Sequence, residues 1–353
     1  MIAVVHHPHY LIATPRGTAY RGGKNGAIRD LLRAEGEAIA WHEPETMPQA
    51  WLEAVHDPAY VAEVLAAAVP REKERRTGFP ITPDVARRAQ MVPGGTHLAA
   101  LLALEHGFAA NSAGGSHHAL ADTGAGYCVF NDLAIAAHRL VAEGKVARIA
   151  IVDVDVHQGD GTAALTAGHP QIATYSIHAE KNFPARKARS TLDVPLVDGV
   201  GDAAYLDALE ATLAPFLDDH RPDLILYQGG VDPFAGDRLG RLALSDEGLA
   251  ARDRLVADLA IARGIPLAST VGGGYGDDVM AIARRHVRVI LTLGEAFDIA
   301  RHRGLAPGSS PHPGPQAIRS ETPVPETVAD ADAQARIAPG RNRSTLAGEA
   351  SRS

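Results

Sequence analysis

Short apolar runs alternate along the chain with longer segments whose apolar residues recur at helical spacing. Runs rich in β-branched residues predict six strands, at residues 2–5, 149–154, 172–177, 224–227, 266–271 and 287–293. Most of these runs are apolar at every position, which is typical of parallel strands that helices cover on both faces.

Three segments between these runs predict helices, at residues 132–143, 202–217 and 246–263. Asn131 or Asp132 caps the first helix. Ser245 or Asp246 caps the third, and a glycine follows the first and the third, where helices often end. The alternation of strands and helices predicts an α/β fold, with three αβα layers around a mostly parallel, doubly wound sheet.

Composition and charge narrow the class of protein. The 353 residues are 46% hydrophobic and 22% charged, which is ordinary for a globular protein with a large core. The net charge of −8 provides no general attraction to nucleic acid, so no nucleic-acid partner is expected. No apolar run approaches the roughly 20 residues that span a membrane, and the amino terminus lacks a secretory pattern. We therefore expect a cytoplasmic protein.

Two further features concern single regions of the chain. Pro, Ser, Arg and Ala dominate from residue 305 onward, so we expect a domain over residues 1–304 and a disordered tail over 305–353.

Cys128 is the one cysteine of the sequence, which excludes an internal disulfide and a cysteine-based zinc site. Cys128 has no cationic neighbour in sequence and is not predicted to be a nucleophile.

The first group of chemical residues follows the predicted strand at 149–154. Asp153, Asp155 and His157 alternate there, so they share one side while the chain stays extended. Burying two carboxylates beside an imidazole is costly unless a cation neutralises them, and these groups suit a divalent transition ion. The alternative is a solvated strand end with a turn.

Two other segments could complete this site. Asp232 follows the predicted strand at 224–227 and offers a third ligand, although an Asp-Pro pair is often only a turn signal. His117 and His118 stand in a glycine-flanked loop and could act as base and acid, because imidazole titrates near neutral pH. Two exposed loop histidines are the plainer interpretation.

Tyrosines in two glycine-rich segments also carry possible chemistry. Tyr275 follows three glycines, and its phenol could donate a hydrogen bond to a developing oxyanion. Such a turn could also bind phosphate. Gly126 and Tyr127 lie among small residues and could form the wall of a narrow channel, or an ordinary packed loop.

The chain resembles the histone deacetylase family, and most closely its class IV and class IV-like bacterial members. The resemblance is carried, in this order, by NSAGGSHHAL, GYCVFNDLAIA, IVDVDVHQGDGTA, YSIHAEKNFPARK, LDVPL, YQGGVDPFAGDRLGRLALS and GGGY. It covers residues 56–293. It implies an arginase/deacetylase-like fold and a metal-dependent amidohydrolase that removes the acyl group from N-acyl-lysine.

The resemblance also implies a role for each residue of the site. Asp155, His157 and Asp232 are the metal ligands, His117 and His118 the catalytic pair, Asp153 and Asp160 the carboxylates that orient the pair, Tyr275 the residue that polarises the scissile carbonyl, and Gly126 and Tyr127 the substrate-binding channel wall. The implied ion is Zn²⁺, and Fe²⁺ or Mn²⁺ would also suit these ligands. A structural K⁺ is implied near Asp153, Asp155, His157 and Ser176.

The implied mechanism is hydrolysis by a metal-activated water. The ion holds the water and the acyl oxygen, and His118 takes the proton of the water. The histidine pair then protonates the leaving amine, while Tyr275 and the ion stabilise the oxyanion.

The sequence departs from the family in two places. Residues 14–25 fit the amino-terminal family pattern poorly, and residues 78–88 hold no counterpart of the rim aspartate that grips substrate backbone in some members. The substrate could be an acyl-lysine protein or peptide, or an acetylpolyamine or another small N-acyl-amine. A non-catalytic binding module is a second alternative. A binuclear arginase-type site would need another carboxylate two residues before Asp232, where Gly230 stands.

Overall fold

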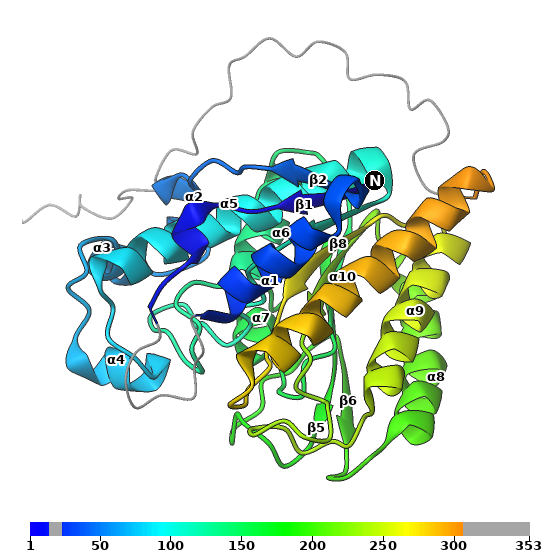
Figure 1. Cartoon of the computed structure of the whole chain (residues 1–353). Coiled ribbons are helices and arrows are strands. Elements are labelled where there is room, and N and C mark those ends of the chain that lie inside the picture. Colours follow the sequence, from blue (N-terminus) through cyan, green and yellow to red (C-terminus); the bar gives the residue numbers. More distant parts are fainter. Residues whose placement is uncertain (14–22, 306–353) are drawn as a thin grey trace, which may run out of the picture. The chain divides into compact units, whose positions relative to one another are not determined.

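The described residues, 1–13 and 23–305 of this computed structural model, contain one sheet of eight strands (Figure 1). Its order is β2-β1-β3-β8-β7-β4-β5-β6, and every neighbouring pair is parallel. The strands are β1 Ile2–Val5, β2 Ile39–His42, β3 Phe108–Asn111, β4 Ile149–Asp153, β5 Ile172–Ala179, β6 Leu192–Leu196, β7 Leu224–Gly229 and β8 Leu267–Val271.

Helices cover both faces of this sheet (Figure 1). The helices against one face are α1 Gly23–Ala34, α8 Asp202–His220, α9 Asp246–Ala262 and α10 Val279–His302. Those against the other face are α5 Pro83–His106 and α6 Asp132–Ala142. Strand β4 shows how the two cores divide, because Ala150 and Val152 pack in the first and Ile149 and Ile151 in the second. The predicted three-layer αβα class is confirmed.

Short helices lie among the loops of the sheet. They are α2 Gln49–Glu53, α3 Pro58–Leu65, α4 Arg71–Thr77 and α7 Asp160–Leu165, with 3₁₀ turns at Pro8–Tyr10 and Gly36–Ala38. A separate apolar cluster, which includes Tyr60 of α3, Val85 of α5 and Phe130, fixes this region beside the carboxyl ends of the strands. In the described part of the chain, no helix has the length and apolar character that a membrane crossing requires.

The three predicted helices are confirmed with small shifts at their ends. Asn131 is the N-cap of α6, since its side chain accepts a hydrogen bond from the Ala134 N–H. Ser245 is the N-cap of α9 and accepts one from the Gly248 N–H. Helix α8 continues past the predicted end at residue 217 to His220.

The strand predicted at residues 287–293 is wrong, because this segment lies inside α10. Its buried residues include His286, Ile290 and Leu293, which recur every three or four positions, while Arg284 and Arg288 are exposed. That is helical periodicity, and it decides the structure although the run is rich in valine and isoleucine. The other five predicted strands are confirmed, within one or two residues at each end.

Three strands were not predicted. β3 has the sequence Phe-Ala-Ala-Asn, which is short and lacks β-branched residues. β6 contains Pro195 and lies at the edge of the sheet, where proline is tolerated because its missing N–H can face away from the ladder. β2 is the opposite edge strand and is only partly buried.

The sheet brings the chemical motifs together. β3, β8, β7, β4 and β5 are neighbours, and their carboxyl ends point to the same edge because all are parallel. The loops that hold His117, Tyr275, Asp232 and Asp155 follow the first four of these strands. In open α/β sheets ligands bind at this edge.

Candidate active site

Asp155, His157 and Asp232 form a buried group that could hold a metal ion. One ligand atom from each lies within 4.8 Å of the others. His157 Nδ1 is 3.0 Å from Asp155 Oδ1 and 3.2 Å from Asp232 Oδ2. A tetrahedral ion with bonds of about 2.0–2.1 Å separates its ligands by about 3.3 Å, so these spacings fit one ion.

The rest of the hydrogen bonding leaves room for that ion. Asp155 Oδ2 accepts hydrogen bonds from Gln228 Nε2 at 2.8 Å and from the Gly273 N–H at 2.7 Å. Asp232 Oδ1 accepts one from the Val156 N–H at 2.9 Å. No described residue donates a hydrogen bond to Asp232 Oδ2, which is fully buried.

The electrostatics of the two carboxylates also favour a cation. Burial raises the pKa of Asp232, and the adjacent Asp155 charge raises it further. The two carboxylates in turn raise the pKa of His157 to about 10, so this group of three attracts positive charge, and a divalent ion would supply that charge in place of the proton on His157. The donor set fits Zn²⁺ and does not exclude Fe²⁺ or Mn²⁺.

A side chain at position 230 would obstruct this group. A Cβ atom built on Gly230 would overlap Asp155 Oδ2. A binuclear site would need an extra carboxylate at position 230. That position holds a glycine, because any side chain there would displace the ligand Asp155. Among the described residues there is one group of this kind.

The tandem histidines lie beside the group, each tied to a carboxylate. His117 Nδ1 is 2.6 Å from Asp153 Oδ2, and His118 Nδ1 is 2.7 Å from Asp160 Oδ1. The two rings are 4.0 Å apart between centroids. In both residues the carboxylate holds Nδ1, so Nε2 is the nitrogen left for chemistry.

The two imidazoles differ in proton affinity. Burial lowers the pKa of His117, but the charges of Asp153 and Asp155 outweigh this effect and raise it to about 9. Burial lowers the pKa of His118 to about 3, and the neighbouring His117 charge adds to the shift. A pair of this kind contains one ring that keeps its proton and one that is free to accept a proton.

The cavity in front of His118 and His157 is narrow and aromatic. It has a volume of about 350 Å³, and its lining includes Tyr127, Phe183 and Tyr275. The rings of His118 and Phe183 meet edge to face at 4.8 Å. We call this cavity the mouth.

Gly126 forms part of the wall of the mouth, where a side chain would collide with His118. Its φ of +52° lies in the left-handed region, and a Cβ atom there would lie 2.5 Å from His118 Cδ2. Tyr127 has a φ of 68°, which costs about 1–2 kcal/mol for a residue with a side chain. The predicted wall residues therefore lie in the mouth, and the backbone of Tyr127 is held in an unfavourable conformation.

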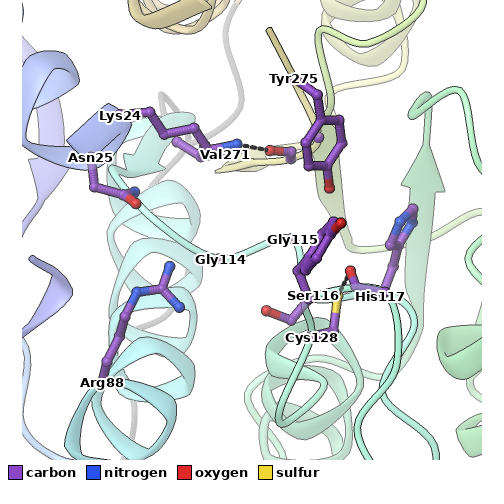
Figure 2. A pocket seen from close by; sticks show the side chains of 15 residues that line it. Lys24, Asn25, Arg88, Gly114, Gly115, Ser116, His117, Cys128, Val271 and Tyr275 are labelled. Atoms are coloured by element: carbon purple, nitrogen blue, oxygen red, sulfur yellow. Dashed lines mark hydrogen bonds between the residues drawn. The ribbon is translucent and has the colours of Figure 1, made fainter. Parts of the chain in front are cut away.

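A second, smaller cavity lies on the other side of Tyr275. Its volume is about 50 Å³, and its lining includes Lys24, Arg88 and His117. Figure 2 shows Lys24, Asn25 and Arg88 on one side of this space, opposite Tyr275 and His117. Lys24 Nζ donates a hydrogen bond to the Gly272 carbonyl at 2.7 Å and lies 5.9 Å from the centre of the Tyr275 ring. We call this space the inner chamber.

The residues predicted around potassium also lie together. Asp153 and Ser176 are partners across β4 and β5, and both are buried. Ser176 Oγ forms a hydrogen bond of 3.0 Å with His178 Nδ1. The potassium site stays a prediction.

Sequence reasoning missed several residues of the site. Lys24 belongs to the segment at 14–25 that fits the family pattern poorly; residues 14–22 of it, and 306–353 of the predicted tail, lie outside the described residues. Gln228 and Phe183 stand in segments that carry the resemblance, but no chemical reason had singled them out. Cys128 is buried, which raises the pKa of its thiol and agrees with its exclusion as a nucleophile.

Comparisons with known proteins identify the family of the chain. The pattern of the histone deacetylase domain matches residues 23–291. An uncharacterized protein of Picosynechococcus is 42% identical over 285 residues, which is 80% of this chain and 95% of that protein. A histone deacetylase-like amidohydrolase of Pseudomonas aeruginosa is 34% identical over 155 residues, or 41% of each chain.

A solved structure shows the same fold. The acetylpolyamine aminohydrolase of Burkholderia pseudomallei matches with a TM-score of 0.69 and 21% identity, over 84% of this chain and 99% of that chain. The domain match covers more than half of the sequence and confirms the resemblance carried by the motifs. The chain belongs to the histone deacetylase family and is a hydrolase that acts on amide bonds.

Proposed function

We propose that this hydrolase removes the acyl group from N-acyl-lysine, with Asp155, His157 and Asp232 holding one Zn²⁺ ion. When bound, such an ion polarises an acyl carbonyl and lowers the pKa of water. The observation that carries the proposal is the contact between the metal-ligand group and the histidine pair: His117 Nε2 lies 3.8 Å from Asp155 Oδ1. We also propose K⁺ at the oxygens of Asp153, Asp155, His157 and Ser176.

The histidine pair divides the proton transfers. His118 is neutral at neutral pH because its pKa is low, and Asp160 engages its Nδ1, so Nε2 has a lone pair that can take the proton of the attacking water. His117 keeps its proton and stabilises the negative charge that develops beside it. When the carbon–nitrogen bond breaks, the pair returns a proton to the leaving amine, which departs as a neutral amine.

Tyr275 is placed to bind the oxygen of the scissile carbonyl. It lines both the mouth and the inner chamber, and its ring lies 6.3 Å from that of His157. Burial and the charges of Asp155 and Asp232 raise the pKa of its phenol, so the hydroxyl keeps its proton and acts as a donor. A donor aimed at a developing oxyanion is one of the largest single contributions to such reactions.

The shape of the mouth favours a linear substrate. Tyr127 and Phe183 provide flat apolar walls, and Gly126 gives room between them. The four methylene groups of a lysine side chain would bury apolar surface there while the amide reaches His118. The lysine backbone would stay outside.

The inner chamber suits the acid product. The Lys24 ammonium and the Arg88 guanidinium both line it, next to Tyr275. Its volume of about 50 Å³ is enough for a small carboxylate. We propose that the released acid is held there by these two cations.

Two variants test the function. We expect His118→Ala and Asp155→Ala each to abolish most hydrolysis of acetyl-lysine peptides by the metal-loaded enzyme. His118→Ala should keep its bound metal, measured by elemental analysis, whereas Asp155→Ala should lose it. His106→Ala, in a half-buried residue at the end of α5 outside both cavities, is the control. Turnover near the unmodified rate in either site variant would refute the assignment.

A further inference from the structure

The rim of the mouth is basic. Arg75 and Arg76, both exposed, come from the last turn of α4 and line the mouth together with Phe183 and Tyr275. No carboxylate is among the residues of the described chain that line the mouth. In the described residues neither guanidinium forms an ion pair with a carboxylate within 4.0 Å, so both charges are available to a ligand.

Backbone hydrogen bonds to the wall of the mouth fix the position of α4. The Gly126 N–H donates to the Arg76 carbonyl at 3.3 Å, and the Tyr127 N–H donates to the Thr77 carbonyl at 2.8 Å. Gly78 then turns the chain at a φ of +97° against the Tyr127 ring. The two arginines are therefore held next to the residues that would surround the acyl-lysine chain.

The opposite side of the mouth adds further positive charge. Phe183 and Asn182 line it, and the exposed Lys181 and Arg186 stand within three residues of Phe183, together with one exposed carboxylate, Glu180. Lys187 is used differently, because its Nζ donates to the carbonyls of Asn182 and Pro184 and holds this loop in shape.

Two carboxylates near the mouth, Asp237 and Glu74, are engaged by backbone N–H groups. Asp237 is turned inward and accepts hydrogen bonds from the N–H groups of Leu239, Gly240 and Tyr275. Glu74 of α4 accepts one from the Ile81 N–H. Asp277 forms an ion pair of 3.5 Å with Arg238.

We infer that the substrate carries negative charge beside the acylated amine, and that it is an acyl-lysine flanked by acidic residues in a peptide. This inference rests on the proposed function and names its substrate class. A polyamine would place a second cation, and a basic peptide several cations, against Arg75 and Arg76. Both would be repelled where an acidic flank is attracted.

The test compares three acetyl-lysine peptides with flanking Glu, Gln or Lys, together with acetylputrescine. Both kcat/KM and the Kd of dye-labelled peptides are measured for the full-length, metal-loaded enzyme. We expect the Glu peptide to be favoured about 2- to 5-fold for each flanking charge at low ionic strength, since exposed ion pairs are weak. The preference should shrink as salt is added.

Charge reversal identifies the residues responsible. Arg75→Glu and Arg76→Glu should each reduce the preference for the Glu peptide over the Lys peptide, and the double variant should abolish or reverse it. Arg71→Glu is the matched control, because it makes the same change in net charge at the other end of α4, outside the mouth. It should leave the order unchanged.

Several results would overturn the inference. They are equal kcat/KM and Kd for the three peptides, a Glu preference that is undiminished in both reversal variants, and more efficient hydrolysis of acetylputrescine than of the Glu peptide. Failure to hydrolyse any of the compounds would count against the proposed function instead. In that case the charge dependence of Kd would still decide whether the rim binds acidic peptides.

Discussion

Gly273 allows the metal-ligand group to form. A Cβ atom at this position would overlap Asp232 Oδ2 and lie 2.7 Å from Asp155 Oδ2, while the Gly273 N–H donates to Asp155. The residue therefore provides a hydrogen bond that requires its backbone to approach two ligands closely. Any side chain would push one of those ligands aside.

Gly273→Ala should therefore lower metal affinity. We expect the purified variant to contain much less than one ion per chain, because the added methyl group displaces Asp155 or Asp232. Elemental analysis after dialysis measures this. Gly276→Ala is the control, since a Cβ there would meet Ile282 Cδ1 at an ordinary 3.6 Å. Full occupancy in Gly273→Ala would show that the two ligands do not hold the ion.

Tyr275→Phe isolates the phenolic hydroxyl. The ring and its contacts in the mouth remain, so substrate binding should change little. We expect kcat to fall by about 10²- to 10³-fold, as for the loss of other oxyanion donors. Steady-state kinetics separates kcat from KM. A fall in kcat of less than about 3-fold would exclude Tyr275 as the donor.

At the scale of helices and strands, α9 supports the loop that carries Asp232. Arg252 of α9 is fully buried, pairs with Asp253 at 2.8 Å and donates to the Gly230 carbonyl at 2.7 Å. The Tyr227 hydroxyl donates to the same Asp253 carboxylate at 2.6 Å. This network fixes the end of β7 two residues before Asp232.

Arg252→Met should destabilise the protein by about 3–5 kcal/mol, because it leaves the Asp253 charge buried and unpaired. Urea denaturation monitored by circular dichroism measures the change. Arg254→Met on the same helix is the control: Arg254 pairs with Asp258 in the open, where such pairs are worth about 1 kcal/mol or less. Equal losses in the two variants would contradict this account.

Sequence patterns were reliable for long apolar strands and for amphipathic helices, and unreliable for short or edge strands. β1 and β4 were predicted because their runs are apolar throughout, and the alternation after β4 brought Asp155 and His157 to one side. The run at 287–293 was misread because its valines and isoleucines outweighed the helical spacing of the arginines around it. β3 was not predicted, because its apolar run is short and contains no β-branched residue.

The parts of the site that the sequence did not predict are contacts between distant segments. Lys24 reaches the Gly272 carbonyl from a helix 248 residues earlier in the chain. No local pattern marks a lysine for such a contact, since a charged residue at a helix start usually faces solvent. The motifs located the ligands, whereas the inner chamber needed the packed fold.

At the scale of the whole molecule, the proposed roles of the two cavities put substrate entry in the mouth and the released acid in the inner chamber. Burial lowers the pKa of Lys24 to about 8, although Asp232 and Asp155 oppose that shift. The ammonium is therefore charged at neutral pH and loses its charge as the pH rises through 8. Attraction for a carboxylate in the inner chamber should disappear over the same range.

Inhibition by acetate should report this titration. We expect acetate to inhibit the unmodified enzyme more weakly above pH 8 than at pH 7, and Lys24→Met to show weaker inhibition with no such change. Inhibition constants measured between pH 6.5 and 9.5 test this. Lys145→Met, in an exposed lysine after α6, is the control. A pH dependence that persists in Lys24→Met would place the acid elsewhere.

The location of Arg75 and Arg76 on α4 has a wider consequence. Helix α4 contacts the wall of the mouth through backbone hydrogen bonds. Its described residues form no part of the sheet and include no residue of the metal-ligand group. Its outward side chains can thus be exchanged while the reacting groups stay in place. A few mutations in α4 could therefore change which acylated substrate is preferred, while the hydrolytic activity is preserved.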